Sequence, residues 1–249
     1  MNNTDKNLQK FLLPAFIILG ILVMGIIAVF FISTNNDEDA PKEIGNQIIE
    51  PTMTDLINRL HAPIEKITSN DYIRGNPNAP IMFVSYTDYD CELCGLFHIV
   101  MSRIVQAYGS DGLVALTKRY ASFNDDTTKS LEIANAVKCV GELAGNVAYW
   151  KLSDILFETR HREDEINLNQ IKVFNSENNV NTDDFDKCVN ENRYYELLKN
   201  QNSDAVSSGA FMSPFTVFIV GDEVAVIRGY HPYIEIATIL ENIIDNIPE

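Results

Sequence analysis

The stretch SYTDYDCELCGLFHIV, residues 85–100 of this 249-residue chain, holds two cysteines three positions apart. Cys91 and Cys94 follow an apolar run, and after them Phe97 and Met101 recur at helical spacing. Residues at i and i+3 of a helix are about 5–6 Å apart at Cβ, and a small rotamer change brings two such cysteines to disulfide distance. The spacing suits a redox-active dithiol, an inert structural disulfide or part of a zinc site.

Zinc would need more ligands than this stretch provides. Cys91, Cys94 and His98 form a run of three residue types that zinc accepts. Structural zinc sites take four ligands, and the chain has no second Cys-x-x-Cys pair. We therefore favour the redox dithiol and keep the inert disulfide and the zinc site as alternatives.

The pattern around the two cysteines predicts a strand, a helix and a second strand. Residues 81–86 are apolar and follow a turn cluster, as is typical of a buried strand. The helix ends near Gly109, and residues 113–120 have the composition of another strand. Strands joined through a helix in this way are expected to be parallel.

The rest of the chain completes a mixed α/β order. Residues 128–208 have helical patterns, and strand-like sequence returns at residues 214–220 and 223–229. Gly221 and Asp222 lie between these two strands as a two-residue hairpin signal. A C-terminal amphipathic helix follows. This order predicts a thioredoxin fold with a helical domain inserted in its middle.

A long uncharged segment precedes this domain. Residues 11–33, FLLPAFIILGILVMGIIAVFFIS, contain no charged side chain. At roughly 1.5 Å per residue they span a hydrocarbon core of about 30 Å. A cleavable signal peptide has a shorter apolar region and a small-residue cleavage site, and no convincing site follows here. We therefore expect one uncleaved transmembrane helix rather than a signal peptide or a buried core helix.

The charges beside this segment predict its orientation. Lys6 and Lys10 precede it, and three acidic residues follow at 37–39. Lysine bias keeps a short tail in the cytoplasm, so residues 1–10 are expected to be cytoplasmic and the rest of the chain periplasmic or extracellular. The polar residues 34–69 are expected to form a stalk, and residues 70–249 the folded domain.

Charge and cysteine content limit the function classes. The formal net charge is −16, which argues against nucleic acid or anionic lipid as a partner. All four cysteines lie after the predicted anchor. An even cysteine count in an oxidising compartment suggests two disulfides.

Several of these segments together resemble the DsbA-like thiol:disulfide oxidoreductases. GNPNAPIMFVSYTDYDCELCGLFH is similar to the start of that family, in which a strand leads into Tyr-x-Asp-x-x-Cys-x-x-Cys. KCVGELAGNVAYWKLSDILFE and FDKCV resemble its inserted helices, and GAFMSPFTVFIVG resembles the segment that carries its cis-proline. The resemblance runs from about residue 71 to residue 247.

The resemblance implies roles for six residues. Cys91, at the start of a helix, would be the attacking sulfur and Cys94 the resolving one. Ser213 and Pro214 would bind an extended substrate peptide. The remaining pair, Cys139 and Cys188, would form a structural disulfide.

The function implied is a membrane-anchored, extracytoplasmic thiol:disulfide oxidoreductase that acts on the thiols of secreted proteins. The redox-active disulfide is its whole redox centre, with no metal or nucleotide. If the protein is an oxidase, a quinone-linked membrane oxidase would reoxidise it. A reductase or isomerase of the same fold and a non-catalytic peptide-binding module remain alternatives.

Several positions depart from the family pattern: Glu92-Leu93 between the cysteines, Ser85 in place of a buried acid, and Ser213 before the proline. Leu93 replaces a common histidine and cannot stabilise a thiolate. The acids near Cys91, at positions 88, 90 and 92, oppose a thiolate by like-charge repulsion, although the loss of an acid at Ser85 acts the other way. We expect a milder oxidant than the strongest members of the family.

Overall fold

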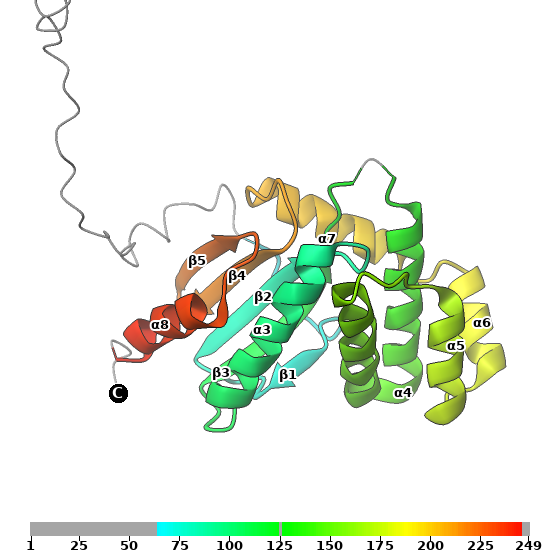
Figure 1. The fold of residues 1–249 in the computed structure, drawn as a ribbon, viewed down its shortest axis with the longest axis horizontal. Helices are drawn as coiled ribbons and strands as arrows, with labels where there is room; N and C mark the ends of the chain where they lie inside the picture. Colours follow the sequence, from blue (N-terminus) through cyan, green and yellow to red (C-terminus); the bar gives the residue numbers. More distant parts are fainter. Residues whose placement is uncertain (1–63, 125, 246–249) are drawn as a thin grey trace, which may run out of the picture. The chain divides into compact units, whose positions relative to one another are not determined.

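The computed structural model describes residues 64–124 and 126–245, which form a five-stranded sheet flanked by helices (Figure 1). The strands are β1 (Ile73–Gly75), β2 (Ile81–Thr87), β3 (Val114–Tyr120), β4 (Phe215–Val220) and β5 (Glu223–Arg228). Their order across the sheet is β1-β3-β2-β4-β5. The mixed α/β fold expected from the sequence is confirmed, and the central strand β2 is the one that leads to the two cysteines.

The strands β2 and β3 are parallel, as their connection through a helix predicts. Ile81 is paired with Val114, and the register continues along both strands. The connecting helix is α3 (Glu92–Tyr108). Every residue of β2 and β3 is buried. Continuous apolar runs are typical of parallel strands that are covered on both faces.

The predicted hairpin is also present. β4 and β5 are antiparallel, and each lies within one residue of its expected bounds. Gly221, between them, has φ +59°, a left-handed conformation that glycine adopts without strain.

The edge strand β1 was not predicted. It pairs antiparallel with β3 and has only three residues, too few to display the alternation of a strand. Gly75 ends it with φ +97°, and a Cβ atom at this position would lie 2.6 Å from the carbonyl oxygen of Val114. Only glycine fits this close approach to β3.

Helices fill the chain between β3 and β4, in the region where the sequence predicted a helical insertion. They are α4 (Thr128–His161), α5 (Leu168–Glu177), α6 (Thr182–Asn190) and α7 (Tyr195–Ser207). Gly145, with φ +80°, bends α4 into two segments. The C-terminal helix α8 (Tyr233–Ile244) packs beside α3.

The sheet buries side chains on both faces. Phe83 and Leu116 face the side covered by α3, α4 and α8. Because successive strand residues point to opposite faces, Ser85 and Lys118 also lie on this side and Arg119 lies on the other, where α7 packs.

The predicted anchor at residues 11–33 and the predicted stalk up to residue 63 lie outside the described residues. In the part of the chain that is described, no helix combines the length and the apolar character needed to cross a bilayer. Residues 64–69 contain no helix or strand, but they are bonded to the domain. Arg119 donates hydrogen bonds to the carbonyl oxygens of Glu65 at 2.8 Å and Lys66 at 3.0 Å.

Candidate active site

Cys91 is the N-cap residue of α3, and Cys94 lies in the first turn of the helix. The two form a disulfide with their Cα atoms 5.2 Å apart, and Sγ of Cys91 accepts a hydrogen bond from the backbone N–H of Cys94 at 3.1 Å. Cys91 is partly exposed, whereas Cys94 is only 1% exposed. Cys91 is therefore the sulfur that an outside thiol can reach, and free N–H groups at the helix start favour a thiolate there.

The loop before α3 is fixed by Asp88, which is completely buried. Its carboxylate accepts hydrogen bonds from the backbone N–H of Asp90 at 2.8 Å, from the hydroxyl of Ser130, and from the amide of Asn124 at 3.4 Å. Its carbonyl oxygen accepts the backbone N–H of Cys91 at 3.3 Å. The sequence grouped Asp88 with acids that repel a thiolate, but the structure shows that it holds the loop in place.

The segment that begins β4 lies against Cys91. The carbonyl oxygen of Ser213 is 3.7 Å from Sγ of Cys91, although the two residues are 122 positions apart. The Ser213–Pro214 peptide bond is cis. The carbonyl oxygen of Pro214 accepts the backbone N–H of Gly229 at 2.8 Å. The structure thus places the predicted substrate-binding segment, Ser213 and Pro214, next to the predicted attacking sulfur of Cys91.

His98 lies one turn after Cys94 and is bonded to α4. Its Nε2 is 2.7 Å from Oδ1 of Asp154, its ring stacks on Phe157, and its Nδ1 is 3.5 Å from Nζ of Lys118. Burial and the neighbouring Lys118 lower the pKa of His98 to about 3, so the imidazole is neutral near pH 7. We infer that Nε2–H donates to Asp154 while Nδ1 accepts from Lys118. Among the described residues, no three side chains form a metal-binding group.

Lys118 is a buried cation that the sequence analysis did not identify. It is 3% exposed, and its Nζ lies 4.6 Å from the ring centre of Trp150 and 4.5 Å from that of Phe157. Burial lowers its pKa well below that of a free lysine. The sequence does contain a sign of this buried lysine, which is the pair of adjacent cations at the end of a largely apolar strand. Because successive strand residues point to opposite faces, Lys118 and Arg119 cannot both lie on the same side of the sheet.

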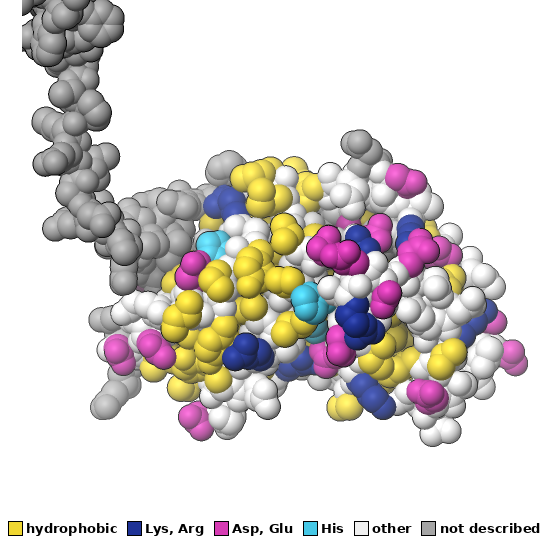
Figure 2. Space-filling model, in the orientation of Figure 1, with side chains coloured by type: hydrophobic (Ala, Val, Ile, Leu, Met, Phe, Trp, Pro, Cys, Tyr) yellow, Lys and Arg dark blue, Asp and Glu magenta, His cyan; other side chains and the backbone are white. Residues whose placement is uncertain are grey.

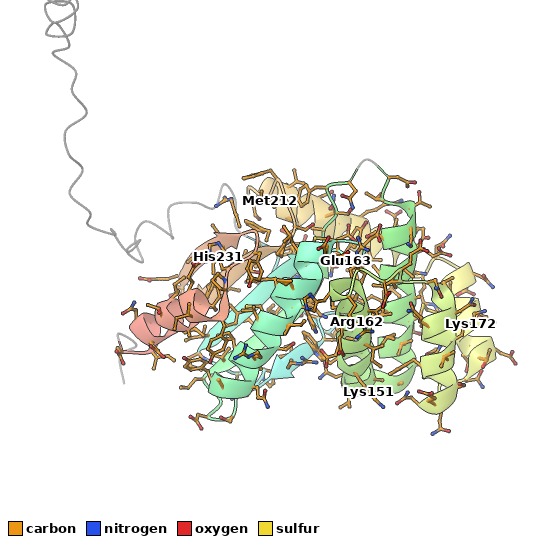
Figure 3. All side chains as sticks on the ribbon, viewed as in Figure 1. Lys151, Arg162, Glu163, Lys172, Met212 and His231 are labelled. Carbon is orange, nitrogen blue, oxygen red and sulfur yellow. A yellow bond between two sulfur atoms is a disulfide. The ribbon has the colours of Figure 1, made fainter. Side chains whose placement is uncertain are left out.

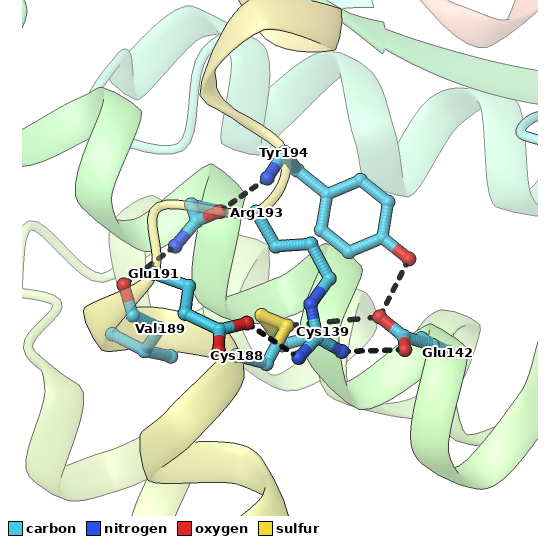
Figure 4. The surroundings of a disulfide bond; sticks show 8 residues. Cys139, Glu142, Cys188, Val189, Glu191, Arg193 and Tyr194 are labelled. Atoms are coloured by element: carbon cyan, nitrogen blue, oxygen red, sulfur yellow. Dashed lines mark hydrogen bonds and ion pairs between the residues drawn. A yellow bond between two sulfur atoms is a disulfide. The ribbon is translucent and has the colours of Figure 1, made fainter.

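The second disulfide joins two helices of the insertion (Figure 4). Cys139 of α4 and Cys188 of α6 are both fully buried, with Cα atoms 6.0 Å apart. An oxygen of Glu142 lies 3.7 Å from Sγ of Cys188, and Arg193 and Tyr194 donate hydrogen bonds to this carboxylate at 2.6 and 2.9 Å. A carboxylate beside the sulfur disfavours a thiolate, which suits a bond that is not exchanged.

The chain belongs to the thioredoxin family. The family model described as thioredoxin matches residues 68–235, which include both strands and the helix around the dithiol as well as the whole insertion. A comparison with curated proteins finds no match.

Solved structures with the same fold come from several bacteria. Wolbachia pipientis alpha-DsbA1 is 20% identical with a TM-score of 0.60, and the alignment covers 71% of this chain and 92% of that one. Oxidised BdbD from Bacillus subtilis is 16% identical with a TM-score of 0.62, covering 74% and 98%. Wolbachia pipientis alpha-DsbA2, titled a thiol-disulfide exchange protein, is 18% identical with a TM-score of 0.56, covering 70% and 88%. At these identities the similarity is one of fold.

Proposed function

We propose that this chain is a membrane-anchored thiol:disulfide oxidoreductase that acts outside the cytoplasm on the thiols of secreted proteins. The observation that carries the proposal is a reachable sulfur, Cys91, bonded to a buried one, Cys94, at the start of α3. The DsbA-type neighbours support it through their common fold. The anchor at residues 11–33 and its orientation rest on the sequence.

Oxidation of a substrate proceeds in two exchanges. A substrate thiolate attacks Sγ of Cys91, the bond to Cys94 breaks, and Cys94 leaves as a thiolate that takes up a proton. A second substrate thiolate then attacks the substrate sulfur of the mixed disulfide and releases Cys91 as a thiolate. The substrate loses two electrons and two thiol protons. The cysteine pair gains both electrons and, at Cys94, one proton, and the other proton goes to solvent while Cys91 remains a thiolate.

The backbone beside Cys91 is placed to hold the substrate. The Ser213 carbonyl lies next to Sγ of Cys91, so a peptide passing this edge could be bound through main-chain hydrogen bonds. We assign substrate binding to Ser213 and Pro214 on this ground. The reverse exchange gives a reductase. For an oxidase, a quinone-linked membrane oxidase would restore the Cys91–Cys94 disulfide.

Trapping of a mixed disulfide tests the proposal. Full-length Cys94→Ser protein keeps the attacking thiol but cannot resolve the intermediate. We expect it to form an adduct with a disulfide-containing substrate protein that dissociates on reduction, and we expect Cys91→Ser to form none. A Cys94→Ser protein that binds substrate, has an alkylatable Cys91 and yet forms no adduct would instead support the non-catalytic binding module.

A further inference from the structure

One side of Cys91 is an exposed apolar surface. Leu93 of α3 is 53% exposed, and Phe211 and Met212, just before the loop that contacts Cys91, are 65% and 39% exposed. Tyr230 is 37% exposed, and its ring packs edge-on against Phe97 of α3. Figure 2 shows hydrophobic side chains gathered over this part of the molecule, and Figure 3 places Met212 beside the start of α3.

The residue that directly follows the reachable sulfur carries a carboxylate. Glu92 directly follows Cys91, occupies the first turn of α3 and is exposed. Among the described residues its side chain has no hydrogen-bond or ion-pair partner. Its charge is therefore available to a molecule that approaches Cys91.

Two cations interact with Asp90, the acid just before Cys91. Lys129 is shared between Asp90, at 3.8 Å, and Glu165, at 2.8 Å. Arg160 donates to the carbonyl oxygen of Asp90 at 3.1 Å. Figure 2 shows acidic side chains, with basic ones among them, beside the start of α3. Neither Lys129 nor Arg160 forms an ion pair with Glu92.

We propose that Glu92 is a specificity-determining residue that favours substrate cysteines flanked by a positive charge. The inference rests on the proposed exchange at Cys91. In an extended substrate the neighbours of the reacting cysteine lie about 3.3 Å per residue away, within the range at which an exposed carboxylate attracts a cation. The exposed apolar residues near the dithiol, Leu93 and Met212, would accept an uncharged neighbour. The preferred substrate segment is thus both basic and apolar.

Three peptides that differ only in the residue beside a single cysteine test this proposal. One carries lysine and another glutamate at this position, and the third, with serine, is the neutral reference. The measurement is the second-order rate constant for attack of the peptide thiol on Cys91, which opens the Cys91–Cys94 bond to a mixed disulfide, in the full-length protein at low ionic strength. A second peptide molecule then completes the reduction of the pair. We expect the lysine-to-glutamate rate ratio to fall by about threefold to tenfold in Glu92→Gln and to invert in Glu92→Lys. Differences in peptide thiol pKa cancel when ratios are compared between variants.

Salt and a matched variant separate this effect from a general change in reactivity. High salt should reduce the wild-type ratio, because it screens exposed charges. Glu223→Gln makes the same charge change at the β4–β5 turn, which adjoins the start of β2 rather than its end, and should leave the ratio unchanged. If the serine peptide reduces the pair but Glu92→Gln leaves the ratio unaltered, the inference is overturned and the function stands. If no peptide reduces the pair through Cys91, both are overturned.

Discussion

Leu93 lies between the two cysteines, and a substitution there is expected to change the redox potential of the pair. It is exposed and can neither carry charge nor donate a hydrogen bond. We expect Leu93→His to lower the pKa of Cys91, because an imidazolium beside the thiolate stabilises it. The thiolate form stabilises the reduced pair, so the disulfide should become more oxidising. Titration of thiolate absorbance in the reduced proteins measures the first effect, and equilibration with glutathione measures the second.

A distant histidine is the control for this prediction. Val147→His adds the same side chain at an exposed position of α4 and should change neither quantity. Because Asp88 is buried within its own hydrogen bonds, the acids left beside Cys91 are Asp90, which is partly exposed, and Glu92, which is exposed. Equal pKa values in wild type and Leu93→His would show that local charge does not set the reactivity of the pair.

Single residues near the dithiol were predictable to different degrees. The spacing of Cys91 and Cys94 depends only on neighbours along the chain, so the sequence predicts that they can form a disulfide. The contacts of His98 depend on α4, which brings Asp154 beside it across 56 positions. No local pattern reveals that packing, which is why His98 could be considered as a zinc ligand from sequence alone.

Among the elements, the insertion depends on the disulfide between α4 and α6. Closure of the 49-residue loop between Cys139 and Cys188 stabilises by roughly 4 kcal/mol in the chain-entropy model. We expect the double variant Cys139→Ser, Cys188→Ser to lose free energy of unfolding on this order while retaining much of its exchange activity. Urea unfolding and the peptide-reduction rate measure the two quantities.

The activity result decides the role of this pair. Neither Cys139 nor Cys188 contacts the dithiol, so loss of this disulfide should affect exchange only through stability. A double variant that is folded but inactive would reject the structural role and indicate a relay of electrons between the two cysteine pairs.

The long elements were predictable because each has its own periodic signal. β2, β3 and the hairpin strands agree with their expected bounds within about a residue. β1 escaped prediction because three residues carry no period, and its place is set by pairing with β3. The bend in α4 coincides with Gly145, whose φ of +80° lies outside the helical range.

For the molecule as a whole, buried lysines predict that stability rises with alkaline pH. Burial lowers the pKa of Lys138 to about 8, and burial lowers that of Lys118 as well. The unfolded chain, with lysine pKa values of about 10.4, therefore binds more protons than the folded chain above pH 8. The free energy of unfolding should increase between pH 8 and about pH 9.5, with Lys138 contributing up to about 1 kcal/mol per pH unit.

The slope with pH, rather than the absolute stability, tests this prediction. Lys138→Met removes the hydrogen bond to the carbonyl oxygen of Asn70 and should also make the rise in stability shallower. Lys151→Met is the matched control, since Lys151 is an exposed lysine of the same helix. Identical slopes in wild type and Lys138→Met would mean that this amine stays charged in the folded protein. Unfolding is measured at each pH with urea.

The attachment of residues 64–69 predicts how the anchored protein responds to a protease. Arg119 forms an ion pair with Asp71 at 2.9 Å, in addition to its bonds to the carbonyl oxygens of Glu65 and Lys66. The carboxylate of Asp204 accepts the backbone N–H of Glu65 at 3.0 Å. Residues 64–69 are therefore tied to the domain, and the predicted stalk before them is the part expected to be cut.

Protease added outside spheroplasts should then release a soluble fragment that starts near this point and retains both disulfides. The expectation follows from the lysine bias before residues 11–33, which places the domain outside the cytoplasm. Mass spectrometry of the fragment gives its first residue, and thiol alkylation before and after reduction gives its disulfide content. Arg119→Met should move the cut toward residue 71, since it releases the carbonyl oxygens of residues 65 and 66. Protection of the domain in intact spheroplasts, with digestion only after lysis, would reverse the orientation and place the dithiol in a compartment that keeps it reduced.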